Sequence, residues 1–584
     1  MGISIIDSTQ SGFQWVADRV WKVEHAFERA NASGVKASST RMRIFCILVG
    51  MTVAYVSLAG FAARGSLQGR GQIAALTGEP NARAQLQDRN GQLLAVDVND
   101  YSLFVDPNDM TGDDRAMVRR ALLQIFPDLP REQIDKPFKG DRRLLLTNNL
   151  KAAKRDEILN YGLPGISFEA ARVRDYPLAN TGSAYIGMTQ RGGEGLSGAE
   201  KALQDQIAGN AATDQPVTLA MDLRIQGTME NELRAMAIAQ KAQSAIGIVT
   251  NVRTGEVLAL ASWPDFDLNR PGQFSDADKR NHAAVDRYEL GSIFKVISIS
   301  VGLDTGTTSL SAVYDGRQPL KIGNRFVHDE HASSELLSLT DVFIKSSNIG
   351  TSRIALDVGA TAMTRYYEAL GLFRSADIEL TEPASPLLPG RWSDGSLANS
   401  AFGQGMAITP LSFIEAANAT LNGGYLRPLT IKKYDGHSPL PGTQVFSAAT
   451  SRTMLELMRQ NVLKGTGTRA NAPGLRVGGK TGTAQKPGNG HYTRENISSF
   501  LAVFPIDGPV DGDRYSVLVT FDSPQGAPES NGSRMGGPVA APVAGHVIER
   551  IAPFVGVARK EDKFTGPGWD KAPVAAEDVT GEEH

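Results

Sequence analysis

The sequence predicts an α+β protein in which a five-stranded antiparallel sheet is flanked by helices, preceded by a β-rich pedestal and by one transmembrane helix. Three observations lead to this organisation. An uncharged apolar stretch lies near the N-terminus, and short β-like runs follow it. From about residue 216, amphipathic helical patterns alternate with longer apolar strands. Strands separated by a block of helices are typical of an α+β domain.

Length and composition exclude several classes of protein. The 584 residues allow about three or four folded units, which is too much for a single small binding module. Because 60 basic side chains stand against 63 acidic ones, no positive excess favours nucleic acid as a partner. The single cysteine, Cys46, excludes both a disulfide framework and a thiolate metal cluster.

The apolar stretch from Ile44 to Ala63 contains no charged residue and, at about 30 Å as a helix, is long enough to cross a bilayer. A cleavable signal peptide is the alternative, since the stretch ends in small residues. Its 43 preceding residues are more than such a leader usually has, so we expect a retained anchor. Basic residues gather more densely before the stretch than after it, which favours a cytoplasmic N-terminus.

The two ends of the chain differ in pattern. Residues 1–43 are expected to form a cytoplasmic tail in which Val16, Val20, Val23 and Phe27 recur at helical spacing. That stripe suits a short helix on the membrane or against a partner, and a partly ordered tail is the alternative. Residues 557–584 are polar, rich in glycine, proline and acid, and lack periodicity, so we expect them to be disordered.

Two folded units are expected between these ends. Residues 64–215 contain short β-like runs, and the Asn90-Gly91 pair offers a hairpin turn ahead of the apolar run Leu93–Val96. This region is the expected pedestal, and it contains no cluster of catalytic residue types. Residues 216–556 form the second unit.

In the second unit, Asp222 can cap a helix with Ile225, Met229 and Leu233 on one face. A β-hairpin is expected next, over residues 244–252 and 256–262. After a long helical insertion, further strands are expected at 476–485, 498–504 and 515–522, and a closing helix at 540–551. Five strands of this kind predict an antiparallel sheet with helices on both faces.

Three short motifs carry the chemistry. On a helix, Lys295 lies one turn after Ser292 on the same face, so its amine can take the proton of the hydroxyl. This spacing alone arises by chance, and Ser33 to Lys36 is a second copy. The signal becomes specific because Ser346-Ser347-Asn348 and then Lys480-Thr481-Gly482-Thr483 follow in order within the same expected domain.

These motifs resemble the active site of the penicillin-binding, serine D,D-transpeptidase and β-lactamase superfamily. Residues 88–91, 162–166 and 195–200 resemble the pedestal of the class B penicillin-binding proteins, and residues 254–259 resemble the start of their transpeptidase domain. The single anchor, the length and Phe402-Gly403-Gln404-Gly405 ahead of Thr409-Pro410-Leu411 are most similar to the division-specific transpeptidases. Two positions depart from the family pattern: Leu290 replaces a usual proline, and Ala84 replaces a common glycine.

The resemblance implies a role for each catalytic side chain. Ser292 would attack the carbonyl between the two terminal D-alanines of a peptidoglycan stem peptide and form an acyl-enzyme. Lys295 would be the base, which requires a lowered pKa that burial and the Lys480 cation would supply. Ser346 would relay the proton to the departing amine. An amine from a neighbouring stem would then form the crosslink.

It also implies a substrate-binding set. Asn348 would hold a substrate amide, and the hydroxyls of Thr481 and Thr483 would receive the terminal carboxylate. Gly482 would let the substrate backbone approach the edge of the strand. The backbone N–H groups of Ser292 and Thr483 would form the oxyanion hole.

By resemblance, the enzyme would sit in the bacterial inner membrane by a single span, with a periplasmic catalytic domain and no cofactor. Its partners would be stem peptides, β-lactam antibiotics and division proteins, including a polytopic peptidoglycan glycosyltransferase. The scattered histidines have no metal-ligand spacing, so no metal is expected.

Three alternatives compete with a division-specific transpeptidase. A β-lactamase is disfavoured because no Glu-x-x-Leu-Asn that could activate water lies near Glu379 and Glu382. An elongation-type transpeptidase would use the same chemistry. A catalytically idle scaffold of the division complex is disfavoured because an idle site has no physical reason to keep Ser292, Lys295 and Lys480 together.

Overall fold

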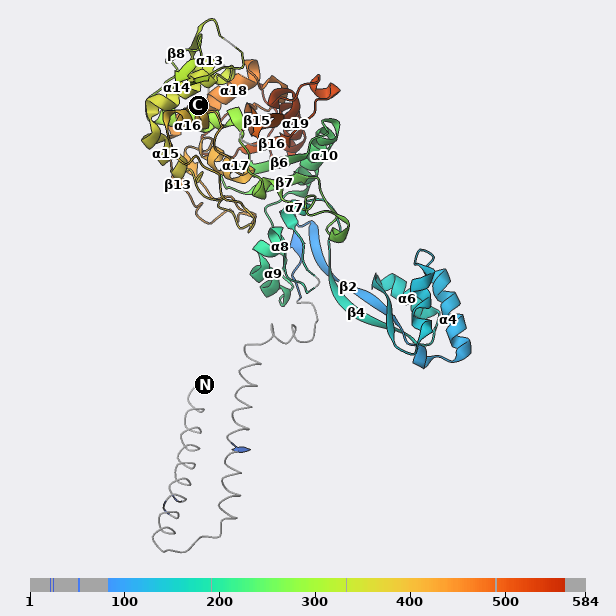
Figure 1. Cartoon of the computed structure of the whole chain (residues 1–584). Helices are drawn as coiled ribbons and strands as arrows, with labels where there is room; N and C mark the ends of the chain where they lie inside the picture. The colour runs from blue at the N-terminus through green and yellow to red at the C-terminus, as the bar shows by residue number, and fades with distance from the viewer. Residues whose placement is uncertain are drawn as a thin grey trace, which may run out of the picture. The chain divides into compact units, whose positions relative to one another are not determined.

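The computed structural model describes residues 82–561, apart from 191, 332, 489 and 490, together with Lys22, His25, Met51 and Thr52. The chain divides into two compact units, residues 1–78 and 79–584, and the labelled elements of Figure 1 belong to the second. The expected cytoplasmic helix, nearly all of the expected span and the residues after 561 lie outside the described residues. No helix among the described residues is long and apolar enough to cross a membrane.

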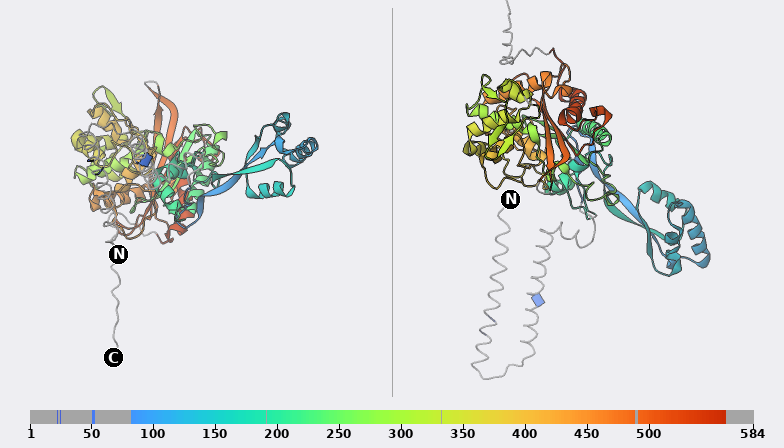
Figure 2. Two further views of the ribbon diagram at one scale, coloured as in Figure 1. Left: turned by 90° about the horizontal axis from the view of Figure 1, so that it is seen from below. Right: turned by 45° about the horizontal axis from the view of Figure 1, so that its top comes forward.

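The first part of the second unit is built on a sheet in the order β3-β2-β1-β5, with β4 paired to β2. β1 and β2 are joined by the expected turn, in which Gly91 has a φ of 82°. Figures 1 and 2 show β2 and β4 side by side, leading to a lobe that contains α4 and α6. The elements are β1 Leu86–Gln87, β2 Leu93–Val105, η1 Pro107–Asp109, α4 Gly112–Ile125, α5 Arg131–Asp135, η2 Pro137–Lys139, β3 Leu144–Leu150, α6 Ala152–Asn160, β4 Ile166–Asp175, α7 Ser183–Ile186, α8 Gly198–Ala202, α9 Gln204–Ala211 and β5 Val217–Thr218.

The expectation of a β-rich pedestal was incomplete, because this part contains several helices as well. α4 begins at a capping box in which Thr111 and Asp114 exchange hydrogen bonds. Its buried residues Val118, Leu122 and Ile125 lie one helical turn apart and pack into a small core with strand residues of β2 and β3. The pedestal is therefore a mixed α and β structure.

The second part has the predicted five-stranded antiparallel sheet, in the order β14-β15-β16-β6-β7. The predicted helix after Asp222 is α10, and Asp222 caps it by accepting a hydrogen bond from the backbone N–H of Arg224. The framing elements are α10 Leu223–Ala239, β6 Ser244–Asn251, β7 Val257–Trp263, β14 Gly478–Pro487, β15 Tyr492–Phe504, β16 Tyr515–Asp522, η6 Pro528–Ser530, α19 Gly536–Ile551 and η7 Ala552–Val555.

The predicted helical insertion lies between β7 and β14. It also contains three short pairs of strands, β8 with β11, β9 with β10 and β12 with β13. Its elements are η3 Pro271–Gln273, α11 His282–Val285, η4 Gly291–Phe294, α12 Lys295–Asp304, β8 Val313–Asp315, β9 Leu320–Ile322, β10 Arg325–Val327, β11 Leu336–Ser338, α13 Leu339–Ile344, α14 Asn348–Val358, α15 Ala360–Ala369, α16 Asp394–Ala401, α17 Pro410–Ala419, β12 Tyr425–Leu426, β13 Thr443–Gln444, α18 Ala448–Lys464 and η5 Thr468–Ala470.

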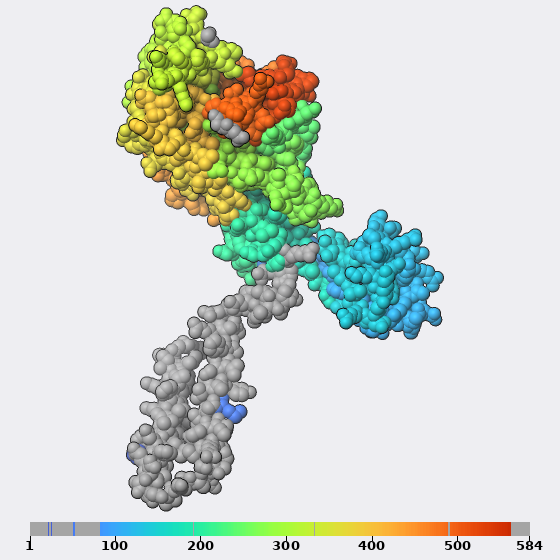
Figure 3. Space-filling model, viewed as in Figure 1, coloured from blue at the N-terminus to red at the C-terminus, as the bar shows by residue number. Residues whose placement is uncertain are grey.

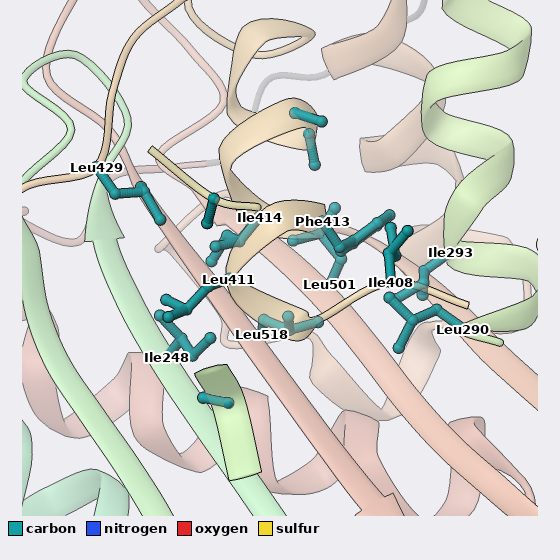
Figure 4. Packing of buried hydrophobic residues seen from close by; sticks show 14 of the residues in the cluster. Ile248, Leu290, Ile293, Ile408, Leu411, Phe413, Ile414, Leu429, Leu501 and Leu518 are labelled. Atoms are coloured by element: carbon teal, nitrogen blue, oxygen red, sulfur yellow. The ribbon is translucent and has the colours of Figure 1, made fainter. Parts of the chain in front are cut away.

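Both faces of this sheet are covered by helices, as the apolar character of its strands predicts. α10 and α19 pack on one face. On the other face, Leu411 and Ile414 of α17 lie against Ile248 of β6 and Leu518 of β16, as Figure 4 shows. β6 and β16 are buried along their whole length. They therefore form a closely packed support for the elements that carry the three motifs.

The C-terminal boundary lies slightly later than expected. Residues 557–584 were expected to be disordered, but the first of them are folded onto the domain. Val557 packs against the core beneath α19, and the backbone N–H of Lys560 donates to the carbonyl of Gly474 over 2.9 Å. The mostly polar composition of residues 557–584 did not predict that Val557 would pack against the domain. The rest of the expected tail lies outside the described residues.

Candidate active site

Residues of all three motifs line one cavity of about 240 Å³. Ser292 comes from η4, Ser346 from the turn between α13 and α14, Asn348 from the first position of α14, and Thr481 and Thr483 from β14. The cavity thus lies where the helical insertion meets the edge of the sheet. Figure 3 shows these two groups of elements, in yellow-green and orange, meeting on one face of the molecule.

Ser292 and Lys295 lie at the start of the central helix of the insertion. Ser292 is half-buried at the cavity, whereas the Lys295 side chain, at the first position of α12, is fully buried. The preceding Gly291 has a φ of 59°, and a Cβ atom there would lie 2.5 Å from the carbonyl oxygen of Thr483. Glycine is therefore required at this position, because the turn approaches β14 closely.

The two motif lysines meet at one hydroxyl. The Lys295 amine donates to Ser346 Oγ over 3.2 Å and to Asn348 Oδ1 over 2.8 Å, and it also donates to the Ser346 carbonyl. The Lys480 amine donates to the same Ser346 Oγ over 2.9 Å. The sequence suggested that Lys295 would contact Ser292 directly. In the structure, its hydrogen bonds are made to Ser346 and Asn348 instead.

A sharp turn places Ser346 between these amines. Ser346 has a φ of 61°, in the left-handed region that is uncommon for residues other than glycine, so the backbone is strained there. Ser347 caps α14 by accepting from the backbone N–H of Gly350 over 2.9 Å. Its hydroxyl donates to Asp329 over 2.7 Å, and the backbone N–H of Ile349 donates to the same carboxylate. Ser347 thus has a structural role as the cap of α14, and Asp329 fixes the turn.

Burial sets the electrostatics of the lysine pair. It lowers the pKa of Lys295 to about 7, while the carboxylates of Asp329 and Glu330 oppose this shift. Burial, reinforced by repulsion from Lys295, also lowers the pKa of Lys480 well below its usual range. The resemblance implied that burial and the Lys480 cation together would lower the pKa of Lys295. The structure makes burial the main cause, with the repulsion acting on Lys480.

β14 forms the opposite wall of the cavity. It is an edge strand, so one side of its backbone has no strand partner. Thr481 Oγ1 is hydrogen-bonded to Thr466 Oγ1 over 2.7 Å, and Thr483 Oγ1 accepts from the backbone N–H of Gly536 over 3.1 Å. A Cβ atom at Gly482 would lie 2.5 Å from the Leu290 carbonyl, so internal packing is sufficient to explain this glycine.

Several other lining residues were missed by sequence reasoning. Phe402 and Gln404 reach the cavity from the loop after α16, Thr466 from the turn after α18, and Glu330 and His331 from the segment after β10. Glycines 403 and 405 are turn residues, with φ values of 80° and 74°. Only Phe402-Gly403-Gln404-Gly405 had a signal in the sequence, through its likeness to a known family. Among the described residues, no group of His, Cys, Asp or Glu could hold a metal ion.

Comparison with known proteins identifies the same two parts. The penicillin binding protein transpeptidase domain matches residues 245–549, and the penicillin-binding protein dimerisation domain matches residues 79–218. The chain is 45% identical over 563 residues to the probable peptidoglycan D,D-transpeptidase FtsI of Caulobacter vibrioides, and the match covers 95% of each chain. It is 30% identical over 499 residues to the peptidoglycan D,D-transpeptidase FtsI of Escherichia coli, covering 80% of this chain and 82% of that one.

A solved structure has the same fold. Penicillin binding protein 3 of Mycobacterium tuberculosis, complexed with aztreonam, is similar with a TM-score of 0.63 and 24% sequence identity. The similarity covers 82% of this chain and 98% of that chain. Both the framing sheet and the pedestal therefore follow an architecture seen in a solved protein.

Proposed function

Because the chain belongs to the penicillin-binding protein transpeptidase family, we propose that it crosslinks peptidoglycan stem peptides during septal wall synthesis, with Ser292 as its nucleophile. The observation that carries the site assignment is the position of Ser346 Oγ between the Lys295 and Lys480 amines, at the cavity that Ser292 lines. A hydroxyl in that position can pass a proton between two buried amines.

In the first half-reaction, Ser292 Oγ attacks the carbonyl between the two terminal D-alanines of a donor stem. Lys295, neutral above about pH 7, accepts the serine proton. The backbone N–H groups of Ser292 and Thr483 stabilise the oxyanion. The peptide bond then breaks, the departing D-alanine nitrogen receives the proton through Ser346, and the donor stays attached to Ser292 as an ester.

Substrate binding uses the walls of the same cavity. The hydroxyls of Thr481 and Thr483 receive the terminal carboxylate of the donor, and Asn348 holds its amide. Gly482 keeps β14 close to the Ser292 turn. In the second half-reaction, the amine of a neighbouring stem attacks the ester, the crosslink forms, and Ser292 regains its proton. A β-lactam imitates the donor and acylates the same serine.

The proposal extends to the organisation of the whole chain. Residues 1–43 are a cytoplasmic tail, residues 44–63 a single inner-membrane span, residues 64–215 the pedestal and residues 216–556 a periplasmic transpeptidase domain. The charge pattern around the apolar stretch supports this orientation. Division proteins, including a polytopic glycosyltransferase, are the proposed partners. Tethering would give the catalytic domain a high local concentration at the wall.

Intact-protein mass spectrometry after treatment with benzylpenicillin tests the nucleophile. We expect the chain to gain one drug mass, Ser292→Ala to gain none, and Lys480→Ala to react far more slowly. Ser33→Ala, in the second copy of the spacing, is the matched control and should react normally. A drug mass on Ser292→Ala would disprove the assignment.

Depletion in cells separates the two biological roles. Loss of a septal enzyme should give filaments that grow without dividing. The elongation-type alternative predicts rounded cells that continue to divide, and that outcome would replace the septal assignment.

A further inference from the structure

The carboxylate of Glu289 joins two walls of the cavity. Glu289 lies three residues before Ser292 and is 8% exposed. Its Oε1 accepts from the backbone N–H of Gly405 over 2.9 Å. Its Oε2 accepts from the hydroxyl of Tyr492 over 3.0 Å. Both carboxylate oxygens thus bind donors that come from other parts of the chain.

One of these donors belongs to the loop that presents Phe402 and Gln404 to the cavity. The loop is also tied to the nucleophile segment by its backbone. The Gly291 N–H donates to the Gly403 carbonyl over 3.1 Å, and Tyr288 and Ile408 exchange two backbone hydrogen bonds. The Gly405 bond to Glu289 lies between these contacts, next to Gln404.

The other donor belongs to the β14–β15 hairpin. Close to the cavity the two strands pair regularly, with Thr483 opposite Ser498. The register shifts between Gln485 and Pro487, so the ladder is interrupted on the side toward Tyr492. Beyond this irregularity, the Tyr492–Glu289 hydrogen bond connects the start of β15 to the nucleophile segment.

We propose that Glu289 is a positioning residue that holds the Gln404 loop and the β14–β15 hairpin at a fixed separation across the donor site. The inference rests on the proposed function and deepens it. Glu289 does not line the cavity itself, and its effect on the donor passes through Gln404 on one side and Thr481 and Thr483 on the other. The two donors reach different oxygens of the Glu289 carboxylate, whereas a glutamine amide would offer one oxygen and one NH2 group in their place.

The proposal predicts which kinetic step depends on Glu289. Loosening the two walls should weaken the noncovalent binding of the donor. The hydrogen bonds among Lys295, Ser346 and Lys480 do not involve Glu289, so bond formation at Ser292 should proceed almost unchanged once the donor is bound.

Stopped-flow acylation of the full-length chain by a fluorescent penicillin separates these steps. Tyr492→Phe removes only the hydroxyl of a side chain that is 42% exposed, so folding should be preserved. We expect the dissociation constant for the first complex to rise by about three- to tenfold, the range for the net loss of one ordinary hydrogen bond, because the Tyr492 hydroxyl acts on the donor only indirectly. The first-order acylation constant should stay within about twofold of wild type, because the lysine pair is intact.

Tyr434→Phe is the matched control, because the Tyr434 hydroxyl donates to the Ser438 carbonyl outside the cavity. Its two constants should equal those of the wild type. Glu289→Gln should weaken binding at least as much as Tyr492→Phe, and the double variant should be no worse than Glu289→Gln, because both changes break the same contact. A variant that only loses folded protein lowers the amount acylated and leaves both constants unchanged.

Normal binding in Tyr492→Phe, or strictly additive effects in the double variant, would overturn the positioning role. Failure of the wild-type chain to be acylated at Ser292 would instead overturn the proposed function. If Glu289→Gln does not fold, hydrogen exchange decides the question with Tyr492→Phe alone. Exchange should rise in both 403–408 and 492–496, and stay unchanged in β16; a rise in neither segment would reject the proposal.

Discussion

Two pairs of buried cations occur in different parts of the second unit, and their partners differ. In the pedestal, Arg83 and Arg174 both donate to the buried carboxylate of Glu200, and Arg174 also donates to Asp97 over 3.0 Å. In the candidate active site, the buried Lys295 and Lys480 amines donate to neutral oxygens of serine, asparagine and threonine. The arginine pair is neutralised by carboxylates, whereas the two lysines share the Ser346 hydroxyl.

The partners of a buried cation decide what burial does to its pKa. Burial opposes the charge of Arg174, but the carboxylates of Glu200 and Asp97 outweigh it and raise the pKa. Burial lowers the pKa of Lys295 to about 7 because the more distant Asp329 and Glu330 compensate only in part. The pedestal pair therefore joins segments of the chain, whereas the lysine pair is prepared to exchange a proton at neutral pH.

The largest effect is expected when Lys295 is replaced. Lys295→Met keeps the bulk of the side chain and removes the proposed base, so acylation by a fluorescent penicillin should fall by about 10³-fold or more. The free energy of unfolding at pH 7 should be unchanged or higher, because an incompletely matched buried charge disappears. Lys345→Met, at the exposed rim of the cavity, is the control and should change acylation little. A large decrease in the free energy of unfolding would instead indicate that Lys295 holds the fold together, as Arg83 and Arg174 do.

Glu200 should show the opposite behaviour. Glu200→Gln leaves two buried guanidinium groups with one fewer carboxylate, which should lower the free energy of unfolding by about 3–5 kcal/mol. The protein that remains folded should still react with penicillin at close to the wild-type rate. The control is Glu157→Gln, which removes an exposed pair with Lys154 and should cost less than about 1 kcal/mol. Chemical denaturation measures the free energy of unfolding of both variants. Equal losses in Glu200→Gln and Glu157→Gln would contradict a structural role for the buried Glu200 carboxylate.

The framing sheet could be predicted because its signals are local. The strands β6, β7 and β16 are apolar runs bounded by turns, and α10 has a cap and a regular apolar stripe. The pedestal helices were missed because their apolar residues are few. In α4 only Val118, Leu122 and Ile125 are buried, and the remaining residues are mostly charged or small. The capping box of Thr111 and Asp114 was the available signal.

The motif residues of the candidate site could be predicted, and their environment could not. Ser292, Ser346 and Thr481 belong to short patterns in a fixed order. Thr466 and Glu289 make their contacts with other elements, at Thr481 of β14 and Tyr492 of β15, so no local spacing reveals them. The same holds for Asp329, which caps α14 from a separate loop. The balance between burial and nearby carboxylates at Lys295 likewise depends on the fold.

The pH dependence of acylation should follow the lysine pair and not the arginine pair. Lys295 acts as a base only when neutral, and its pKa is about 7. The second-order acylation constant should therefore be level above that pH and fall about tenfold for each pH unit below it. A constant rate from pH 8 down to pH 5 would contradict the lysine-base mechanism.

The free energy of unfolding should also depend on the protonation of Lys295. The folded-state pKa of Lys295, about 7, lies below its ordinary value of 10.5, so the folded chain binds fewer protons than the unfolded chain between these values. The free energy of unfolding should accordingly gain a contribution that grows as pH rises through this window. Lys295→Met should remove that slope. An unchanged slope in the variant would assign it to another group.

The smallest effect is expected at Glu330, which tests whether remote carboxylates tune the lysine pair. Its charge raises the pKa of Lys295, so Glu330→Gln should move the midpoint of the acylation profile to lower pH. Because Glu330 is exposed, we expect a shift of only a few tenths of a pH unit, comparable to an exposed ion pair of about 0.2–1 kcal/mol. Asp329 is unsuitable for this test because it also caps α14.

Salt distinguishes this electrostatic effect from a change of shape. Raising the ionic strength to about 1 M shortens the screening length to about 3 Å, so the wild-type and Glu330→Gln profiles should converge. Lys345→Gln alters a charge at the same rim that does not contribute to the pKa of Lys295, and it should leave the midpoint in place. If the Glu330→Gln shift persisted in high salt, a rearranged segment around His331 would explain it better than a lost charge, and the Lys295 pKa would then depend on burial alone.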